Sequence, residues 1–133
     1  QNKFQVIILK ALIEHVAKDR VVELLQKIHS SLKPGGIVLI DVYNADWFFS
    51  NHDRYMDFTH ELGFTQESLK QVMRFAFSNP LVFPMASPLQ LNRKRRWIYQ
   101  LSRKLLKSFL AFVEPEMSST PLFERLLIGY AKK

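Results

Sequence analysis

Two pairs of residues in this sequence carry the side chains best suited to proton transfer. Glu14 directly precedes His15, and Asp57 lies three residues before His60. Imidazole exchanges protons near neutral pH, so a histidine beside a carboxylate could take the proton from a hydroxyl group that is being modified. If Asp57 and His60 meet in space, the carboxylate would also hold the imidazole in one tautomer. Glu14, His15 and His60 are therefore candidate catalytic residues.

Both pairs also have a simpler interpretation. Glu14 and His15 could only shape the approach to the helix that follows them. The segment Asp57-Phe58-Thr59-His60 could only stabilise a loop, through hydrogen bonds between its side chains and the backbone. The sequence leaves these alternatives open.

The composition excludes or disfavours several other kinds of chemistry. The chain has no cysteine, which rules out disulfides, thiolate nucleophiles, cysteine-ligated zinc and iron–sulfur clusters. Its four glycines stand at positions 35, 36, 63 and 129, from which neither a G-x-G-x-x-G loop nor a P-loop can be built. No metal site is predicted, because the four histidines show no paired ligand spacing. These histidines are His15, His29, His52 and His60.

The elements that would position these residues begin with a strand, a helix and a second strand. The 133 residues, 47% of them hydrophobic and 23% charged, suit one globular domain. A continuous apolar run over 4–9 predicts a buried strand, and apolar residues at helical spacing predict a helix over 19–33. A Pro-Gly-Gly sequence would end that helix before a second strand over 37–42. This order indicates a right-handed βαβ crossover with parallel strands.

The rest of the chain is predicted to add a long polar loop and four more elements. A loop of this length in a compact domain is more often functional than idle. Its residues Asn44, Tyr55 and Asp57 are candidates for binding a substrate. Thr65 would cap the next helix, and a run with two prolines would form a strand at the edge of the sheet. The loop covers 43–64, and the elements are a helix from 65, a strand over 79–84, a basic amphipathic helix over 91–113 and a last strand over 126–131.

The order of these motifs resembles the second half of a class I methyltransferase that depends on S-adenosylmethionine. The resemblance rests on the first strand, the Ile13-Glu14-His15-Val16 segment, the Leu32-Lys33-Pro34-Gly35-Gly36 element and the second strand. It implies an α/β fold, with a partial Rossmann-like sheet of about four strands flanked by helices. Residues 1–133 would form a single domain, in which the helix over 91–113 is an insertion.

The resemblance also implies the class of substrate. The segments from Asp57 to Glu61 and from Gly63 to Thr65, together with Ser68-Leu69, are similar to segments of enzymes that methylate sugars or polysaccharide precursors. A saccharide or a lipid-linked saccharide is therefore the expected acceptor of the methyl group.

The same resemblance implies where the cofactor binds. Lys10, Ala11 and Leu12 follow the first strand and would approach the methionine end of S-adenosylmethionine, although they could equally form an ordinary turn. The family's glycine-rich loop and ribose-binding acidic residue would precede Phe4, so most of the cofactor site is expected outside this chain. Gln5 stands where members usually carry an acidic residue. The first strand would then lack a neighbour, which favours association with the missing half or with a second copy.

The net charge of +7 comes from one segment. Seven of the 19 basic residues lie between Arg93 and Lys107, so the other 12 basic residues balance the 12 acidic ones. The helix that carries them would either pack on the domain with a solvated cationic face or bind an anionic membrane surface or a polyanion. A non-catalytic module that binds in this way is the alternative to an enzyme. No nucleic-acid-binding motif is present, and a cytoplasmic location, with or without contact to a membrane surface, is expected.

Overall fold

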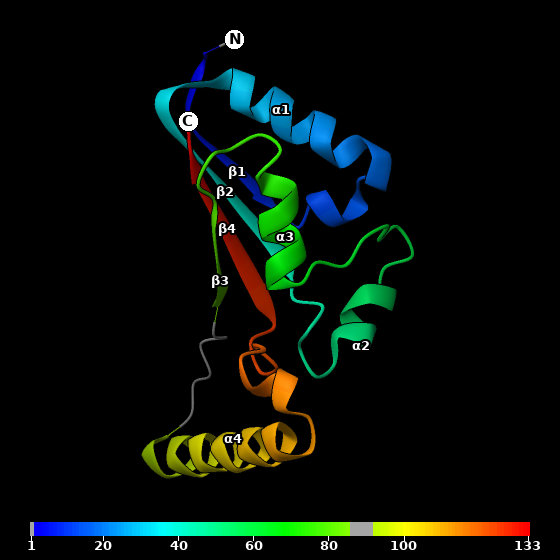
Figure 1. The fold of residues 1–133 in the computed structure, drawn as a ribbon, viewed down its shortest axis with the longest axis vertical. Coiled ribbons are helices and arrows are strands. Elements are labelled where there is room, and N and C mark those ends of the chain that lie inside the picture. The colour runs from blue at the N-terminus through cyan, green and yellow to red at the C-terminus, as the bar shows by residue number, and fades with distance from the viewer. Residues whose placement is uncertain (1, 86–91) are drawn as a thin grey trace.

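Four strands form one mixed sheet in the computed structural model, which describes residues 2–85 and 92–133 (Figure 1). The strands are β1 (Phe4–Lys10), β2 (Leu32–Tyr43), β3 (Leu81–Met85) and β4 (Leu126–Lys132). Their order in the sheet is β1-β2-β4-β3; β1 and β2 run parallel, and β4 is antiparallel to both β2 and β3. This confirms the predicted α/β fold with four strands, and it places the proline-containing β3 at an edge of the sheet.

The described residues also form four α-helices and three short 3₁₀ helices. The α-helices are α1 (Val21–Ser31), α2 (Ser50–Tyr55), α3 (Gln66–Met73) and α4 (Arg93–Val113). The 3₁₀ helices are η1 (Ile13–His15), η2 (Lys18–Arg20) and η3 (Pro115–Ser118). None of the helices in the described ranges is both long enough and apolar enough to cross a membrane.

The connection from β1 to β2 is the predicted βαβ crossover. α1 faces the core through Val21, Leu25 and Ile28, which are all buried, as apolar residues at helical spacing should be. The helix is shorter than the predicted 19–33. A 3₁₀ turn occupies its expected start, and Leu32 already has extended backbone and pairs with β1.

Thr65 caps the start of α3, as predicted. Its hydroxyl oxygen accepts a hydrogen bond from the backbone N–H of Ser68 at 3.1 Å, and the Ser68 hydroxyl oxygen accepts one from the backbone N–H of Thr65 at 2.9 Å. This reciprocal capping satisfies N–H groups that the first turn of a helix otherwise leaves free. The helix then buries Leu69 and Met73 and so fixes the end of the long loop.

The two helices that pack along the sheet lie on the same face of it. α1 and α3 are on one side in Figure 1, and their buried residues share one hydrophobic core with Val38, Ile40 and Val42 of β2. Alternate residues of a strand point to opposite faces, and on the other face Val6 and Ile8 of β1 are 47% and 65% exposed. The outer edge of β1 also has no strand beside it among the described residues. Proteins normally cover such faces and edges.

Helix α4 is the predicted basic helix. Leu91, at the start of the predicted range, lies outside the described residues. The side-chain oxygen of Asn92 caps the helix by accepting a hydrogen bond from the N–H of Arg95 at 3.0 Å. None of the described residues of α4 is buried, so the interpretation in which the helix buries its apolar residues against the domain is wrong. The apolar residues at helical spacing in α4 are exposed, and Figure 1 shows the helix lying apart from the four strands.

Candidate active site

The carboxyl end of β1 leads directly to the residues that the sequence singles out. β1 ends at Lys10, and Ala11 then adopts a left-handed backbone conformation with a φ of 45°, which residues other than glycine seldom take. The short helix η1 follows and carries Glu14 and His15. In open α/β sheets, ligands bind outside the carboxyl ends of the strands. Unusual backbone conformations also tend to cluster at functional sites.

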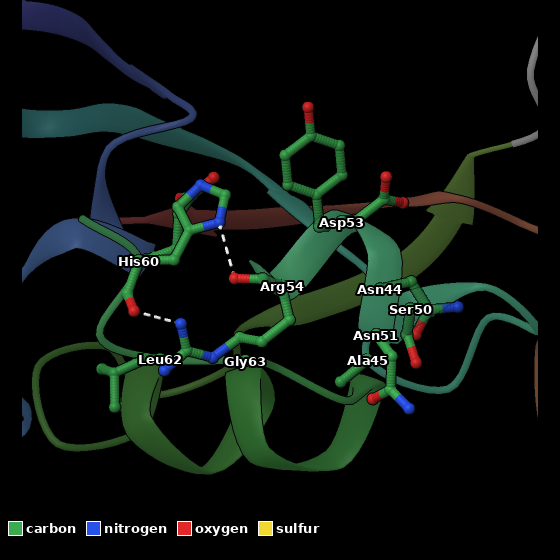
Figure 2. Close-up of a pocket in the computed structure, with 11 residues that line it drawn as sticks. Asn44, Ala45, Ser50, Asn51, Asp53, Arg54, His60, Leu62 and Gly63 are labelled. Carbon is green, nitrogen blue, oxygen red and sulfur yellow. Dashed lines mark hydrogen bonds between the residues drawn. The ribbon is translucent and has the colours of Figure 1, made fainter. Parts of the chain in front are cut away.

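The long loop brings His60 to the same place. The backbone oxygen of Glu14 accepts hydrogen bonds from the N–H groups of Glu61 at 2.8 Å and Leu62 at 3.0 Å. The Arg54 guanidinium donates hydrogen bonds to the backbone oxygens of His60 and Glu61. In turn, Nδ1 of the His60 ring forms a hydrogen bond with the backbone oxygen of Arg54 (Figure 2). These contacts hold this stretch of the loop against η1 and α2.

Glu14, His15 and His60 thereby form one cluster. The ring centroids of His15 and His60 are 4.6 Å apart. One nitrogen of each ring and one carboxylate oxygen of Glu14 lie within 4.8 Å of one another. Tyr43, at the carboxyl end of β2, meets His60 edge-on with ring centroids 6.0 Å apart. The three candidate catalytic residues, from two distant segments, share one site.

The hydrogen bonds of the two rings determine which nitrogen is protonated when each ring is neutral. His60 Nδ1 lies 3.2 Å from the backbone oxygen of Arg54, which can only accept, so Nδ1 carries the proton and Nε2 the lone pair. His15 Nδ1 lies 2.9 Å from the Thr59 hydroxyl, whose own proton is directed at Asp57 Oδ1 at 2.7 Å. His15 Nδ1 therefore also donates, and its Nε2 is free to accept. This corrects the predicted partnership of Asp57 with His60, since Asp57 acts through Thr59 on His15.

The two carboxylates near the cluster have opposite environments. Asp57 is exposed, and the hydrogen bonds that it accepts from the Thr59 hydroxyl and backbone N–H hold its pKa below the ordinary value. Glu14 is only 3% exposed, and neither carboxylate oxygen has a hydrogen-bond partner among the described residues. Burial raises the pKa of Glu14, while the nearby histidines act in the opposite direction. A buried carboxyl group with a perturbed pKa is typical of functional sites.

Two cavities meet at the cluster. Glu14 and Tyr43 line both of them. The first, of about 230 Å³, lies beside the loop that follows β2 and includes His60; Figure 2 shows the residues around it. The second, of about 220 Å³, lies at the carboxyl ends of β1 and β2 and includes Lys10 and Asp41. A group bound in one cavity would therefore come close to a group bound in the other.

The same cluster has the donor set of a metal site, with two imidazoles and one carboxylate. The sequence argument against a metal depended on spacing within one segment. That argument does not apply to ligands that folding brings together from two segments. The free Nε2 atoms and the Glu14 oxygens could bind either a proton or a cation.

A comparison with known protein families identifies the family of this chain. Residues 1–111 match a family model that is described as a methyltransferase domain. The chain belongs to the methyltransferase domain family. No curated protein matches its sequence. The predicted relation to methyltransferases is thus confirmed. The match names no substrate, so the expected saccharide acceptor stays a prediction.

Solved methyltransferase structures share the fold of this domain. A SAM-dependent methyltransferase from Archaeoglobus fulgidus matches 99% of the chain with a TM-score of 0.69 and 18% identity. A possible histamine N-methyltransferase from Thermotoga maritima matches 99% with a TM-score of 0.61 and 14% identity. Phosphoethanolamine N-methyltransferase 2 from Haemonchus contortus, in complex with phosphomonomethylethanolamine and S-adenosylhomocysteine, matches 99% with a TM-score of 0.58 and 20% identity. The matches cover 60%, 57% and 34% of those chains, so this methyltransferase domain spans less than two thirds of their length.

The predicted cofactor residues of the methyltransferase domain lie in different surroundings. Lys10 and Ala11 line the second cavity. Leu12 is 48% exposed and is not among the lining residues of either cavity at the cluster. The structure therefore brings two of the three residues to a possible cofactor site.

The predicted substrate residues are also separated by the fold. Asn44 lines the first cavity, but its side-chain amide donates hydrogen bonds to the backbone oxygens of Pro121 at 2.8 Å and Glu124 at 2.7 Å. Its role in the structure is to join the end of β2 to the segment before β4. Tyr55 is 76% exposed and lies outside the two cavities, and Asp57 reaches the cluster only through its neighbour Thr59.

An ion pair that sequence reasoning missed holds the loop in place. Asp53 in α2 is 1% exposed and accepts hydrogen bonds from Arg125 Nε at 3.0 Å and Nη2 at 2.7 Å, and from Trp47 Nε1 at 2.7 Å. The Arg125 guanidinium also lies over the Tyr43 ring, 5.3 Å from its centroid. Asp53 and Arg125 are 72 positions apart, so no local pattern could reveal the pair.

Proposed function

We propose that this domain takes part in methyl transfer from S-adenosylmethionine to a hydroxyl group of a saccharide or a lipid-linked saccharide. The observation that carries the proposal is the meeting of two cavities at Glu14, with the free Nε2 of His60 on the loop side. One cavity would hold the cofactor and the other the acceptor. The reacting atoms would then meet where the cavities join.

The second cavity suits the cofactor in position and in charge. It lies at the carboxyl end of β1, beside the left-handed Ala11. Its carboxylates, Asp41 and Glu14, complement a cationic sulfonium and amino group, and Lys10 complements a carboxylate. When bound, S-adenosylmethionine supplies an electrophilic methyl group.

The chain's own residues would take up the proton that the acceptor hydroxyl releases. As the acceptor oxygen gains the methyl group, its proton passes to Nε2 of His60, which becomes an imidazolium. Glu14 stabilises that positive charge from within the cluster, and the attraction is strengthened by burial. His15, oriented by Thr59, presents a second lone pair to the same cluster.

The lining of the first cavity supports a polar acceptor that is rich in hydroxyl groups. Ser50, Asn51 and Tyr43 line it with groups that can both donate and accept hydrogen bonds. The loop also carries the segments that resemble sugar-methylating enzymes. Two of the similar structures have names that refer to histamine and phosphoethanolamine, so an amine is the competing acceptor.

The remainder of the cofactor site would come from another part of the methyltransferase fold. Solved structures of this fold are longer than this chain, which matches 60% and 57% of two of them. We expect that part to pair with the free edge of β1, to cover Val6 and Ile8 and to supply the glycine-rich loop. A second copy of the chain is the competing partner for the same edge.

Transfer of a tritiated methyl group by the full-length protein tests the proposed function. The acceptors to compare are monosaccharides, nucleotide-linked sugars and lipid-linked saccharides, with amines as the contrast. His60→Ala should lower kcat by about 100-fold or more, because it removes the base. Its affinity for S-adenosylmethionine, measured by calorimetry, should be nearly unchanged because His60 lies outside the cofactor cavity.

His52→Ala is the matched control, since it removes an exposed histidine of α2 and should retain full activity. Unaltered turnover in His60→Ala would show that His60 is not the catalytic base and only stabilises the loop. Transfer to amines alone would refute a hydroxyl acceptor, and no transfer to any acceptor would refute the function itself.

A further inference from the structure

Helix α4 carries the excess positive charge of the molecule. It lies beyond the end of the sheet at which β4 begins (Figure 1). Seven of its residues are basic and none is acidic. Arg103 forms an ion pair with Glu124. The other six have no ion pair among the described residues and are Arg93, Lys94, Arg95, Arg96, Lys104 and Lys107.

One face of α4 is turned toward the rest of the chain. Its residues recur every three or four positions and are half-buried; they are Tyr99, Arg103, Lys107 and Leu110. The Arg103 guanidinium binds Glu124 and lies over the rings of Tyr99 and Phe123, 5.3 Å and 4.8 Å from their centroids. These contacts fix which face of the helix is turned outward.

The outward face is mainly apolar, with Lys94 as its one basic residue, in the first turn of the helix. At about 100° per residue, five large apolar side chains fall within an arc of about 80° on this face. They are Ile98 (60% exposed), Leu101 (40%), Leu105 (62%), Phe109 (61%) and Phe112 (85%). Lys104 lies on one side of the apolar arc and Arg95 on the other. The exposed helix is thus amphipathic, with basic residues beside its apolar arc.

An anionic lipid surface is the occupant that suits this arrangement best. An apolar arc flanked by lysine and arginine matches the boundary between acyl chains and headgroups, where such helices lie in the membrane plane. A polyanion such as RNA would bind the charges but leave the leucine and phenylalanine side chains in water. A second copy would bring together two helices with seven basic residues each and no acidic residue, which repel each other.

We infer that α4 docks the protein on anionic lipid bilayers and lies in the membrane plane with its apolar arc at the acyl boundary. The helix is also connected to the candidate active site. Glu124, the partner of Arg103, accepts a hydrogen bond through its backbone oxygen from Asn44, which lines the first cavity. Docking through α4 therefore holds that cavity near the bilayer. The inference does not depend on the proposed chemistry.

Co-sedimentation of the full-length protein with lipid vesicles tests the inference. The protein should bind vesicles of phosphatidylcholine with phosphatidylglycerol, and it should not bind phosphatidylcholine alone. Changing all four of Arg93, Lys94, Arg95 and Arg96 to glutamine should weaken binding by about 100-fold or more, because each basic residue near the surface contributes about fivefold. Leu105→Gln with Phe109→Gln should weaken it by about tenfold or more, because the apolar contact is lost.

Matched control variants lie on the rest of the surface. Changing four exposed basic residues to glutamine, Lys3, Lys18, Lys33 and Arg74, removes the same charge and should leave binding nearly unchanged. Phe75→Gln removes an apolar side chain that is 67% exposed away from α4 and should also have little effect. Circular dichroism and thermal unfolding establish that each variant is folded.

Four results would overturn the inference. One is no sedimentation with anionic vesicles at about 0.1 M salt, where charges act over about 10 Å. Another is equal loss of binding in the charge control. Full binding by the variant with Leu105→Gln and Phe109→Gln would mean that charge alone acts. A dimer that this same variant dissociates, seen by analytical ultracentrifugation, would assign the apolar arc to a second copy.

Discussion

Replacing Glu14 by glutamine should stabilise the protein at about pH 8 and change its stability little at about pH 4. Burial raises the pKa of this carboxyl above its ordinary value of 4.5, so the folded state binds the proton more tightly than the unfolded state. Stability is therefore greatest below the ordinary pKa and falls as the pH rises through the raised pKa. Glutamine has a similar shape and no charge, so the variant should lack this fall.

The size of the effect follows from the environment of the carboxylate. A buried polar group without a hydrogen-bond partner costs about 1–3 kcal/mol, and a charged group costs more. The glutamine amide keeps part of that cost, and attraction to His15 and His60 offsets part of it for the carboxylate. We expect a net gain of about 1–2 kcal/mol at about pH 8. For a chain of 133 residues this raises the melting temperature by about 3–7 °C.

Thermal unfolding followed by circular dichroism, from about pH 4 to about pH 8, measures this effect. Glu23→Gln is the control, because Glu23 is exposed and its ion pair with Lys27 at 2.6 Å lowers its pKa. That variant should not be stabilised at any pH. The reasoning is refuted if Glu14→Gln is less stable than the wild type at about pH 8. Glu14 must then have a favourable partner, such as a bound cation.

Other contacts around the cluster lead to three further predictions. Thr59→Val removes the hydroxyl that orients His15 and should lower kcat by about tenfold at an unchanged KM for S-adenosylmethionine. An unchanged kcat in steady-state assays would show that the orientation of His15 does not affect turnover. Asp53→Ala leaves Arg125 without its partner and should destabilise the protein by about 2–3 kcal/mol in urea unfolding. Asp19→Ala, in an exposed ion pair, should cost less than about 0.5 kcal/mol, and equal losses would contradict the importance of burial. Chelation with EDTA should leave turnover unchanged if the cluster acts as a base, whereas a loss that Zn²⁺ restores would identify a metal site.

The helices and strands could be predicted because their signals are local. The apolar run of β1, the Pro-Gly-Gly sequence before the core of β2 and the cap at Thr65 each act within a few residues. The boundaries of these elements also depend on pairing with distant strands. Leu32 looks helical by spacing, yet it joins β2 because pairing with Phe4 outweighs its helical pattern.

The candidate site could be predicted in its residue types but not in its geometry. Histidine and glutamate are recognisable as proton carriers in any sequence. What brings His60 to Glu14 is the Arg54 guanidinium and the N–H groups of the following residues, and these contacts depend on how the whole loop folds. Spacing also could not reveal that Asp57 acts on His15. The link is the Thr59 hydroxyl, which donates a hydrogen bond to Asp57 and accepts one from His15.

The same distinction applies to α4. Helical spacing of its apolar residues predicts the stripe correctly. Whether a stripe is covered depends on the path of the chain between β3 and β4, and in this fold the ion pair of Arg103 turns the opposite face toward the domain. Local pattern therefore gives the amphipathic character of a helix, whereas its partner is a property of the assembled structure.

The place of β4 in the sheet has a consequence for the synthesis of the protein. β4 is translated after the other three strands, yet it lies between β2 and β3. Until it leaves the ribosome, β3 has no strand to pair with, and one edge of β2 stays open. The connection from Met85 to Leu126 takes seconds to translate at about 5–20 residues per second, whereas α4 can form within microseconds. A premature stop before Leu126 should therefore yield aggregated protein rather than a folded domain of lower stability, since it removes the strand that joins the two parts of the sheet.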